Sequence, residues 1–135
     1  MPSLMGVYTR KGKGKRAKRA IILRRGIFLP RAVAVLAHEL THMWIDMYAK
    51  GNYPLEEKEG FCDFIAFKIL EKLGFPPYFA ERHGIFKKQL LRYLKINQFM
   101  SVESMIKSFA GGRQCFIDDV KRAKKSYFGG INAQF

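Results

Sequence analysis

The chain contains little of what defines secreted or membrane-spanning proteins. Only two of its 135 residues are cysteines, Cys62 and Cys115. Two are too few for the disulfide framework of a small secreted domain, and we interpret both as reduced thiols. No apolar run approaches the roughly 20 residues of a transmembrane helix. Arg24 and Arg25 interrupt the one early apolar stretch, at 21–29, so a signal-peptide core is missing as well. We therefore expect a soluble, cytoplasmic protein.

Acidic residues are also scarce, and the resulting positive charge is uneven. The chain has 25 lysines and arginines against 11 aspartates and glutamates, which gives a net charge of +14. Residues 10–25 carry nine basic side chains and no acidic one, and a second basic cluster occupies 121–125. Such segments favour weak binding to an anionic partner, such as nucleic acid, acidic protein or a membrane surface. A solvated loop has the same composition, so charge alone names no partner.

What the chain does contain is enough apolar material for a folded core. Hydrophobic residues make up 48% of it and aromatic residues 14%, which excludes a disordered chain despite the charge. The length suits a single domain spanning 1–135.

The order of apolar and turn residues predicts an α+β fold that is mostly helical. Two short strands are expected at 4–9 and 20–29, joined by a basic hairpin at about 10–19. Pro30 suits a first helical position and Gly74 a helix end. We expect helices at 30–49, 56–73 and 79–96, and one or two more between 101 and 127, with a possible break at Gly111 and Gly112. The result is a small amino-terminal antiparallel sheet with four to five helices.

The first predicted helix carries "HELTH", residues 38–42, which raises the possibility of a metal site. Because His38 and His42 are four residues apart, both imidazoles lie on one stripe of the helix and can bind one ion. Glu39 falls about 100° away, where it reaches a water on the metal rather than the metal. The alternative is a solvent-facing helix with two chance histidines. The opposite face is expected to pack on the core: Val33, Leu36, Ala37, Leu40, Met43, Trp44 and Met47.

A third ligand is available on the second predicted helix. Glu59 and Asp63 lie one turn apart on a stripe that is otherwise apolar. Burying an unpaired carboxylate costs several kcal/mol, so each needs a partner. A zinc ion held by His38 and His42 is such a partner for Glu59. Asp63 can accept the free N–H of a ligating histidine and fix its tautomer. The alternatives are a helix-start acid for Glu59 and a surface acid for Asp63.

The motif and its spacing resemble the gluzincin metallopeptidases, whose third ligand is a glutamate on the next helix. Sixteen residues separate His42 from Glu59 in "KEGF". The segments "TRK", "AIIL", "LPRAVAVLAHELTHMW", "EGFC" and "FKKQLLRYL" resemble, in order, the peptidase domain of the plant ubiquitin-activated growth regulators called DA-one. Asp63 departs from that domain, which has Gln there, and fits the ExxxD pattern of thermolysin-like gluzincins. Those regulators also carry LIM and ubiquitin-interacting modules, which this chain lacks, so ubiquitin activation is not carried over.

The resemblance implies a zincin-like minimal metallopeptidase with one zinc per chain. It makes His38, His42 and Glu59 zinc ligands and Glu39 the general base of a gluzincin-type endopeptidase acting on peptides or proteins. Three protein ligands leave zinc a position for water, whose pKa the metal lowers to about 7. The group that stabilises the developing oxyanion is not fixed by the sequence. His83 is the first candidate, followed by the tyrosines at 48, 53, 78, 93 and 127.

Three other interpretations remain open from the sequence. The first is a basic nucleic-acid-binding protein with a structural zinc site. The second is a protease acting on DNA-bound proteins, as in the Spartan-type enzymes. Those use a third histidine, and His83 lies too far beyond His42 for that spacing. The third is a zinc-dependent scaffold without turnover, which an intact Glu39 disfavours.

Overall fold

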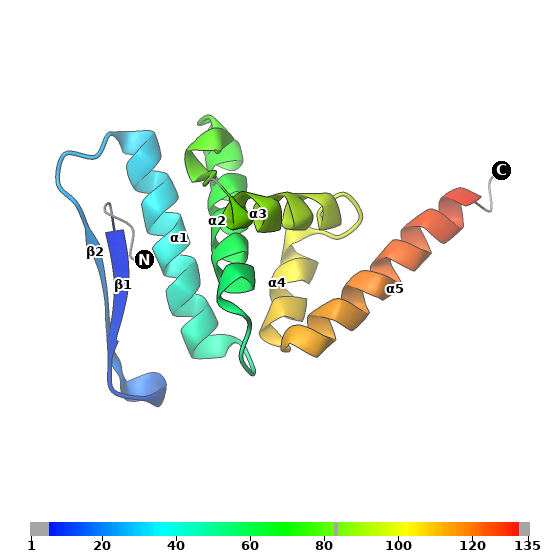
Figure 1. The fold of residues 1–135 in the computed structure, drawn as a ribbon, viewed down its shortest axis with the longest axis horizontal. Helices are drawn as coiled ribbons and strands as arrows, with labels where there is room; N and C mark the ends of the chain where they lie inside the picture. Colours follow the sequence, from blue (N-terminus) through cyan, green and yellow to red (C-terminus); the bar gives the residue numbers. More distant parts are fainter. Residues whose placement is uncertain (1–5, 83, 133–135) are drawn as a thin grey trace.

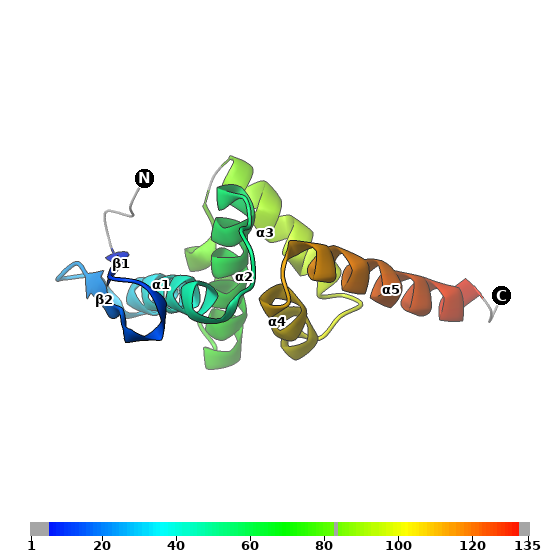
Figure 2. The ribbon, with the colours of Figure 1, turned by 90° about the horizontal axis from the view of Figure 1, so that it is seen from below.

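The fold is a β-hairpin laid against a set of five α-helices, seen in a computed structural model that describes residues 6–82 and 84–132. Figures 1 and 2 show the hairpin beside α1, α2 on the other side of α1, and α5 extending away from the remaining helices. The predicted α+β class, mostly helical with an amino-terminal antiparallel hairpin, is confirmed. None of the helices in the described part of the chain is long and apolar enough to cross a membrane.

The hairpin consists of β1 (Gly6–Lys11) and β2 (Lys18–Leu23), with a short 3-10 helix, η1 (Gly14–Arg16), in its turn. The strands are antiparallel, with Gly6 opposite Leu23 and Lys11 opposite Lys18. The predicted second strand, 20–29, is therefore wrong at both ends. It ends at Leu23 because Gly26, at a φ of 78°, turns the chain into the first helix.

The two helices that were predicted to carry the metal site are present. They are α1 (Leu29–Tyr48) and α2 (Leu55–Leu73), each within one residue of its predicted start and end. The predicted helix at 79–96 is wrong in its first part. A 3-10 helix, η2 (Pro77–Ala80), precedes α3 (Ile85–Ile96), and the two are not one helix because Gly84, at a φ of 72°, is outside the helical conformation. The last helices, α4 (Val102–Ala110) and α5 (Arg113–Asn132), break at Gly111 and Gly112 as predicted.

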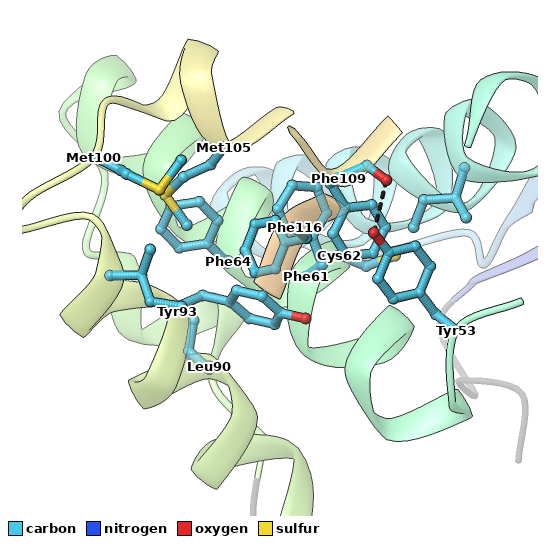
Figure 3. Close-up of a cluster of buried hydrophobic side chains, with 12 residues drawn as sticks. Tyr53, Phe61, Cys62, Phe64, Leu90, Tyr93, Met100, Met105, Phe109 and Phe116 are labelled. Carbon is cyan, nitrogen blue, oxygen red and sulfur yellow. Dashed lines mark hydrogen bonds between the residues drawn. The ribbon is translucent and has the colours of Figure 1, made fainter. Parts of the chain in front are cut away.

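An aromatic core joins α2 to α3, α4 and α5 (Figure 3). The ring of Phe61 stacks on Phe109 with centroids 4.0 Å apart, and Tyr53 stacks on Phe109 at 3.9 Å. The hydroxyl of Tyr53 donates to the carbonyl of Phe109 at 2.7 Å, so its burial leaves no unsatisfied polar group. Ile45 and Trp44 of α1 also pack into this core, so it fixes α2 against α1 as well as against the later helices.

The face of α1 that packs on the core is only partly the one predicted. Ala37 is buried and Val33 and Trp44 pack against the core, as predicted. Leu36 and Leu40 are instead 39% and 43% exposed, and Ala34 and Thr41 are buried in their place. Small side chains let the two helices approach closely, and the larger leucines are left at the edge of the contact. The helical-wheel estimate failed at these positions because it gave large apolar residues more weight than small ones. With this packing, the stripe of α1 that carries His38 and His42 faces α2.

Two glycines allow the close approaches that shape the site. A Cβ atom on Gly6 would lie 2.4 Å from Cγ1 of Val35, so only glycine lets β1 lie this close to α1. A Cβ atom on Gly60 would lie 2.4 Å from Cβ of Gln89, where α3 crosses α2. Gly60 follows Glu59 directly, so this contact fixes the part of α2 that faces the histidines.

Candidate metal centre

The structure brings His38 and His42 together on α1, facing α2. Their ring centroids lie 4.8 Å apart, and both side chains are largely buried. This arrangement follows from their spacing, because residues four apart lie one above the other on a helix. The predicted pairing of the two imidazoles is confirmed.

Glu59 of α2 contacts both histidines. Its Oε2 lies 3.0 Å from Nε2 of His38, and its Oε1 lies 2.9 Å from Nε2 of His42. One carboxylate therefore faces the two nitrogens that the motif would present to a metal. Hydrogen bonds from His38 and His42 outweigh burial and lower the pKa of Glu59, so the carboxylate is ionised.

Asp63 lies on the far side of the His38 ring, as predicted. Its Oδ1 is 2.7 Å from Nδ1 of His38. Asp63 is buried, so this contact supplies the partner that its carboxylate requires. A hydrogen bond at Nδ1 directs the Nε2 lone pair of a neutral His38 toward the position between His42 and Glu59.

Arg82 is a member of the site that the sequence did not reveal. Its Nε donates to Oδ2 of Asp63 at 2.8 Å, and a terminal nitrogen of its guanidinium donates to Oε2 of Glu59 at 2.8 Å. The guanidinium also lies 4.2 Å from the ring centroid of Phe86. Arg82 comes from the loop between η2 and α3, where no periodic pattern marks it. It holds the two carboxylates of α2 in fixed orientations.

Without an ion, these groups compensate one another's charge. Burial lowers the pKa of His38, but hydrogen bonds to Asp63 and Glu59 outweigh it and raise the pKa to about 9. His38 and Arg82 then balance Glu59 and Asp63. A purely structural ion-pair network is the competing interpretation of the cluster, and zinc content distinguishes the two.

The spacing of Glu59 and the two histidines can be compared with that of zinc ligands. Zinc bonds of about 2.0–2.2 Å to nitrogen and oxygen place neighbouring ligand atoms of a tetrahedron roughly 3.4 Å apart. The contacts of Glu59 with the two Nε2 atoms, at 3.0 and 2.9 Å, are hydrogen-bond distances and are shorter than this by about 0.4 to 0.5 Å. A small outward movement of these side chains would therefore make room for the ion. One carboxylate and two imidazoles are also a ligand set typical of catalytic zinc.

Cys62 is a second candidate ligand that the sequence analysis did not consider. Its Sγ and one ring nitrogen of each histidine lie within 4.8 Å of one another. Cys62 shares the helical stripe of Glu59, and that spacing could have identified it. Its side chain is fully buried, and burial together with the negative charge of Glu59 raises the pKa of its thiol. A bound metal deprotonates a coordinating thiol, so Cys62 is a candidate beside Glu59, whose carboxylate contacts Nε2 of both histidines.

Glu39 and the two histidines open onto one hollow. It has a volume of about 290 Å³, and its wall includes His38, Glu39, His42, Glu59 and Tyr8. Glu39 is buried and also lines a neighbouring hollow on the η2 side. Glu39 therefore borders the same hollow as His38, His42 and Glu59.

The hairpin supplies Tyr8 to this hollow, and Asp46 fixes its position. The hydroxyl of Tyr8 donates to Oδ2 of Asp46 at 2.6 Å. Arg10 and Arg19 contact the same carboxylate at 2.5 and 3.4 Å. Asp46 lies one turn beyond His42 on α1, so the helix that carries the histidines also anchors the strand at the rim. The basic hairpin is thus docked at these residues and is not the wholly solvated extension that its charge suggested.

The remaining predicted site residues do not join the cluster. His83 lies outside the described residues. Tyr53 and Tyr93 are buried in the core and donate to the carbonyls of Phe109 and Glu57. Tyr48, Tyr78 and Tyr127 are exposed elsewhere. Tyr8, omitted from the candidates because its strand was not placed beside the motif, is the tyrosine that lines the hollow in the described part of the chain.

Comparison of the chain with models of known protein families, with curated proteins and with solved structures finds no match.

Proposed function

We propose that this protein is a zinc-dependent peptidase with Glu39 as its general base. The observation that supports the proposal best is the placement of Glu59. Its carboxylate lies within 3.0 Å of Nε2 of both histidines, while Glu39 lines the same hollow. A glutamate from a second helix, a pair of histidines four apart and an adjacent glutamate together form the donor set of the gluzincins that the sequence resembles.

Each residue has a defined part in this proposal. His38, His42 and Glu59 would hold one zinc ion, which supplies Lewis-acid polarisation of a peptide carbonyl and lowers the pKa of a water. Glu39 accepts the proton of the attacking water and returns it to the leaving amine. Asp63 keeps the proton of neutral His38 on Nδ1.

Two further side chains suit the stabilisation of the oxyanion. Arg82 and Tyr8 both line the hollow and carry N–H or O–H donors. Arg82 already donates to Glu59 and Asp63, so its orientation is fixed before a substrate binds. The single O–H of Tyr8 donates to Asp46, so Tyr8 could donate to an oxyanion only after releasing that hydrogen bond. Arg82 is therefore the first candidate in place of His83, and Tyr8 is the second.

The experiment that tests the proposal compares the zinc-loaded protein with its chelated form. Both are incubated with a peptide library prepared from digested proteins, and new termini are identified by mass spectrometry. We expect about one zinc per chain, new internal cleavage products with the zinc-loaded protein, and none with the chelated protein. Cleavage that is equal in both samples, or a zinc-loaded protein that cleaves no peptide, would contradict the proposal.

A cytoplasmic location belongs to the same proposal. Cys62 and Cys115 are both free thiols, and Cys115 is exposed. A reducing compartment keeps an exposed thiol in this state.

A further inference from the structure

One end of the molecule combines exposed aromatic and aliphatic side chains with unpaired arginines. Phe28, Leu29 and Tyr78 are 56%, 64% and 60% exposed, although residues of these types are normally buried. Phe28 and Leu29 lie at the start of α1, and Tyr78 lies in η2. We call these residues, together with Arg24, Arg25 and Arg31, the apolar-basic tip. The loop from β2 to α1 that carries it extends beyond the hairpin in Figure 1.

The tip is one continuous surface. The ring of Phe28 meets that of Phe79 edge-on, with centroids 5.0 Å apart, and Tyr78 lies against Phe79 at 4.4 Å. The guanidinium of Arg31 lies 5.8 Å from the centroid of Phe79. Phe79 thus joins η2 to the start of α1, and the exposed rings are held in place.

The arginines of the tip have no acidic partner within the described residues. Arg24, Arg25 and Arg31 line one hollow of about 350 Å³ with Phe28 and its neighbours. No aspartate or glutamate occurs between residues 10 and 38. Glu39, Asp63 and Glu81 line an adjoining hollow with Arg31, but no ion pair joins Arg31 to any of them in the described structure. The hollow therefore holds uncompensated positive charge beside apolar side chains.

Nucleic acid and an anionic membrane differ in what they require of such a surface. Single-stranded nucleic acid is bound mainly by basic groups and by aromatic rings on which bases stack, and these contacts bury little aliphatic surface. The surface of an anionic bilayer attracts arginines to its phosphates and accepts leucine, phenylalanine and tyrosine side chains at the boundary of its acyl region. Leu29 is the most exposed of the three apolar residues of the tip, and it favours the bilayer.

We propose that the apolar-basic tip binds the surface of membranes containing anionic lipids. Arg24, Arg25 and Arg31 contact lipid phosphates, and Phe28, Leu29 and Tyr78 insert at the interface. Binding is peripheral and reversible, because it involves a few side chains and no spanning helix. This interaction does not depend on the peptidase activity. If both hold, the enzyme would act on proteins at a membrane surface.

The test uses the full chain and vesicles of phosphatidylcholine, with or without phosphatidylserine, in a sedimentation assay. We expect binding to vesicles with phosphatidylserine and little to phosphatidylcholine alone. Each arginine near an anionic surface contributes roughly fivefold to partitioning, so the double variant R24S/R25S should bind about 30-fold more weakly. Replacing Phe28 and Leu29 with serine should reduce binding by at least about tenfold, because insertion of apolar area is lost.

A matched control separates the tip from general positive charge. The double variant K124S/K125S removes the same charge from exposed positions on α5, far from the tip. It should bind within about threefold of the unmodified protein, because charges beyond a Debye length of the bilayer contribute little. An equal loss in this control would overturn the proposal. Failure to bind anionic vesicles would also overturn the proposal. If the protein instead binds single-stranded RNA in a gel-shift assay at the same ionic strength, the tip is a nucleic-acid surface. Circular dichroism of each variant verifies the fold.

Discussion

Nδ1 of His38 lies 2.7 Å from Oδ1 of Asp63, and the two residues come from neighbouring helices 25 positions apart in the chain. Asp63 in turn accepts from Nε of Arg82 at 2.8 Å. Asp63 thus fixes the orientation of the His38 ring, and Arg82 in turn fixes the orientation of the Asp63 carboxylate. This relationship makes Asp63 a positioning residue for the proposed metal centre.

Replacing Asp63 with alanine should weaken zinc affinity by roughly 10- to 100-fold, the range found when the hydrogen-bond partner of a ligating histidine is removed. A competition titration with a chromogenic chelator measures this change. Asp63→Asn should lose less, because it retains an acceptor for the His38 N–H. The control is Glu71→Ala, which removes an exposed acid of the same helix whose ion pair in the described part of the chain is with Lys68. If Asp63→Ala and Glu71→Ala bind zinc with equal affinity, Asp63 does not position His38 for the metal and its role is purely structural.

Glu59 and Cys62 can be separated as third ligands by their variants. Glu59→Ala should lose most of the bound zinc, because it removes the carboxylate that contacts both histidines. Cys62→Ala should keep about one zinc per chain, since it leaves the contacts of Glu59 with His38 and His42 intact. Elemental analysis after dialysis gives both numbers. Loss of zinc in Cys62→Ala together with retention in Glu59→Ala would make the cysteine the ligand.

Asp46→Ala should loosen the hairpin from α1, because it removes the acceptor shared by Tyr8, Arg10 and Arg19. Hydrogen bonds to a charged group contribute about 1.5 kcal/mol or more, so the melting temperature should fall by roughly 5 °C. The KM for peptides should rise as the rim of the hollow becomes mobile. Asp118→Ala, an exposed change on α5, serves as the control. An unchanged melting temperature and KM in Asp46→Ala would show that the shared acceptor contributes nothing.

The hairpin should bind nucleic acid weakly and without sequence preference. Lys11, Lys13, Arg16 and Lys18 are exposed, whereas Arg10 and Arg19 contact Asp46. Replacing the four exposed residues with serine should flatten the slope of log affinity against log salt for single-stranded RNA by about 3, as expected for four lost phosphate contacts. Zinc content should not change. Tight, sequence-selective binding that persists at high salt would instead favour a nucleic-acid-binding function.

Local patterns predicted the parts of this molecule that depend on neighbours along the chain. The stripe spacing of His38 and His42, the position of Glu59 one helix later and the hairpin all follow from periodicity and turn residues. The α2 helix was placed within a residue because Gly74 ends it in the left-handed conformation. These features need no knowledge of tertiary contacts.

The missed features depend on contacts between distant segments. Arg82 and Tyr8 reach the site from a loop and from the first strand, and nothing near either residue in the sequence reveals its partners. The buried face of α1 was partly misplaced because α2 packs on Ala34, Ala37 and Thr41 rather than on the larger leucines. A close approach between helices is set by small residues, which carry little weight in a hydrophobic pattern.

The most direct test of the proposed function is the peptide cleavage rate of Glu39→Gln, measured beside its zinc content. Glutamine is nearly the same size as glutamate but cannot accept the proton of water, and Glu39 borders the same hollow as His38, His42 and Glu59. We predict about one zinc per chain, an unchanged melting temperature and a cleavage rate lowered by at least about 100-fold. A Glu39→Gln variant that cleaves peptides at the rate of the unmodified protein would contradict the assignment of Glu39 as the general base.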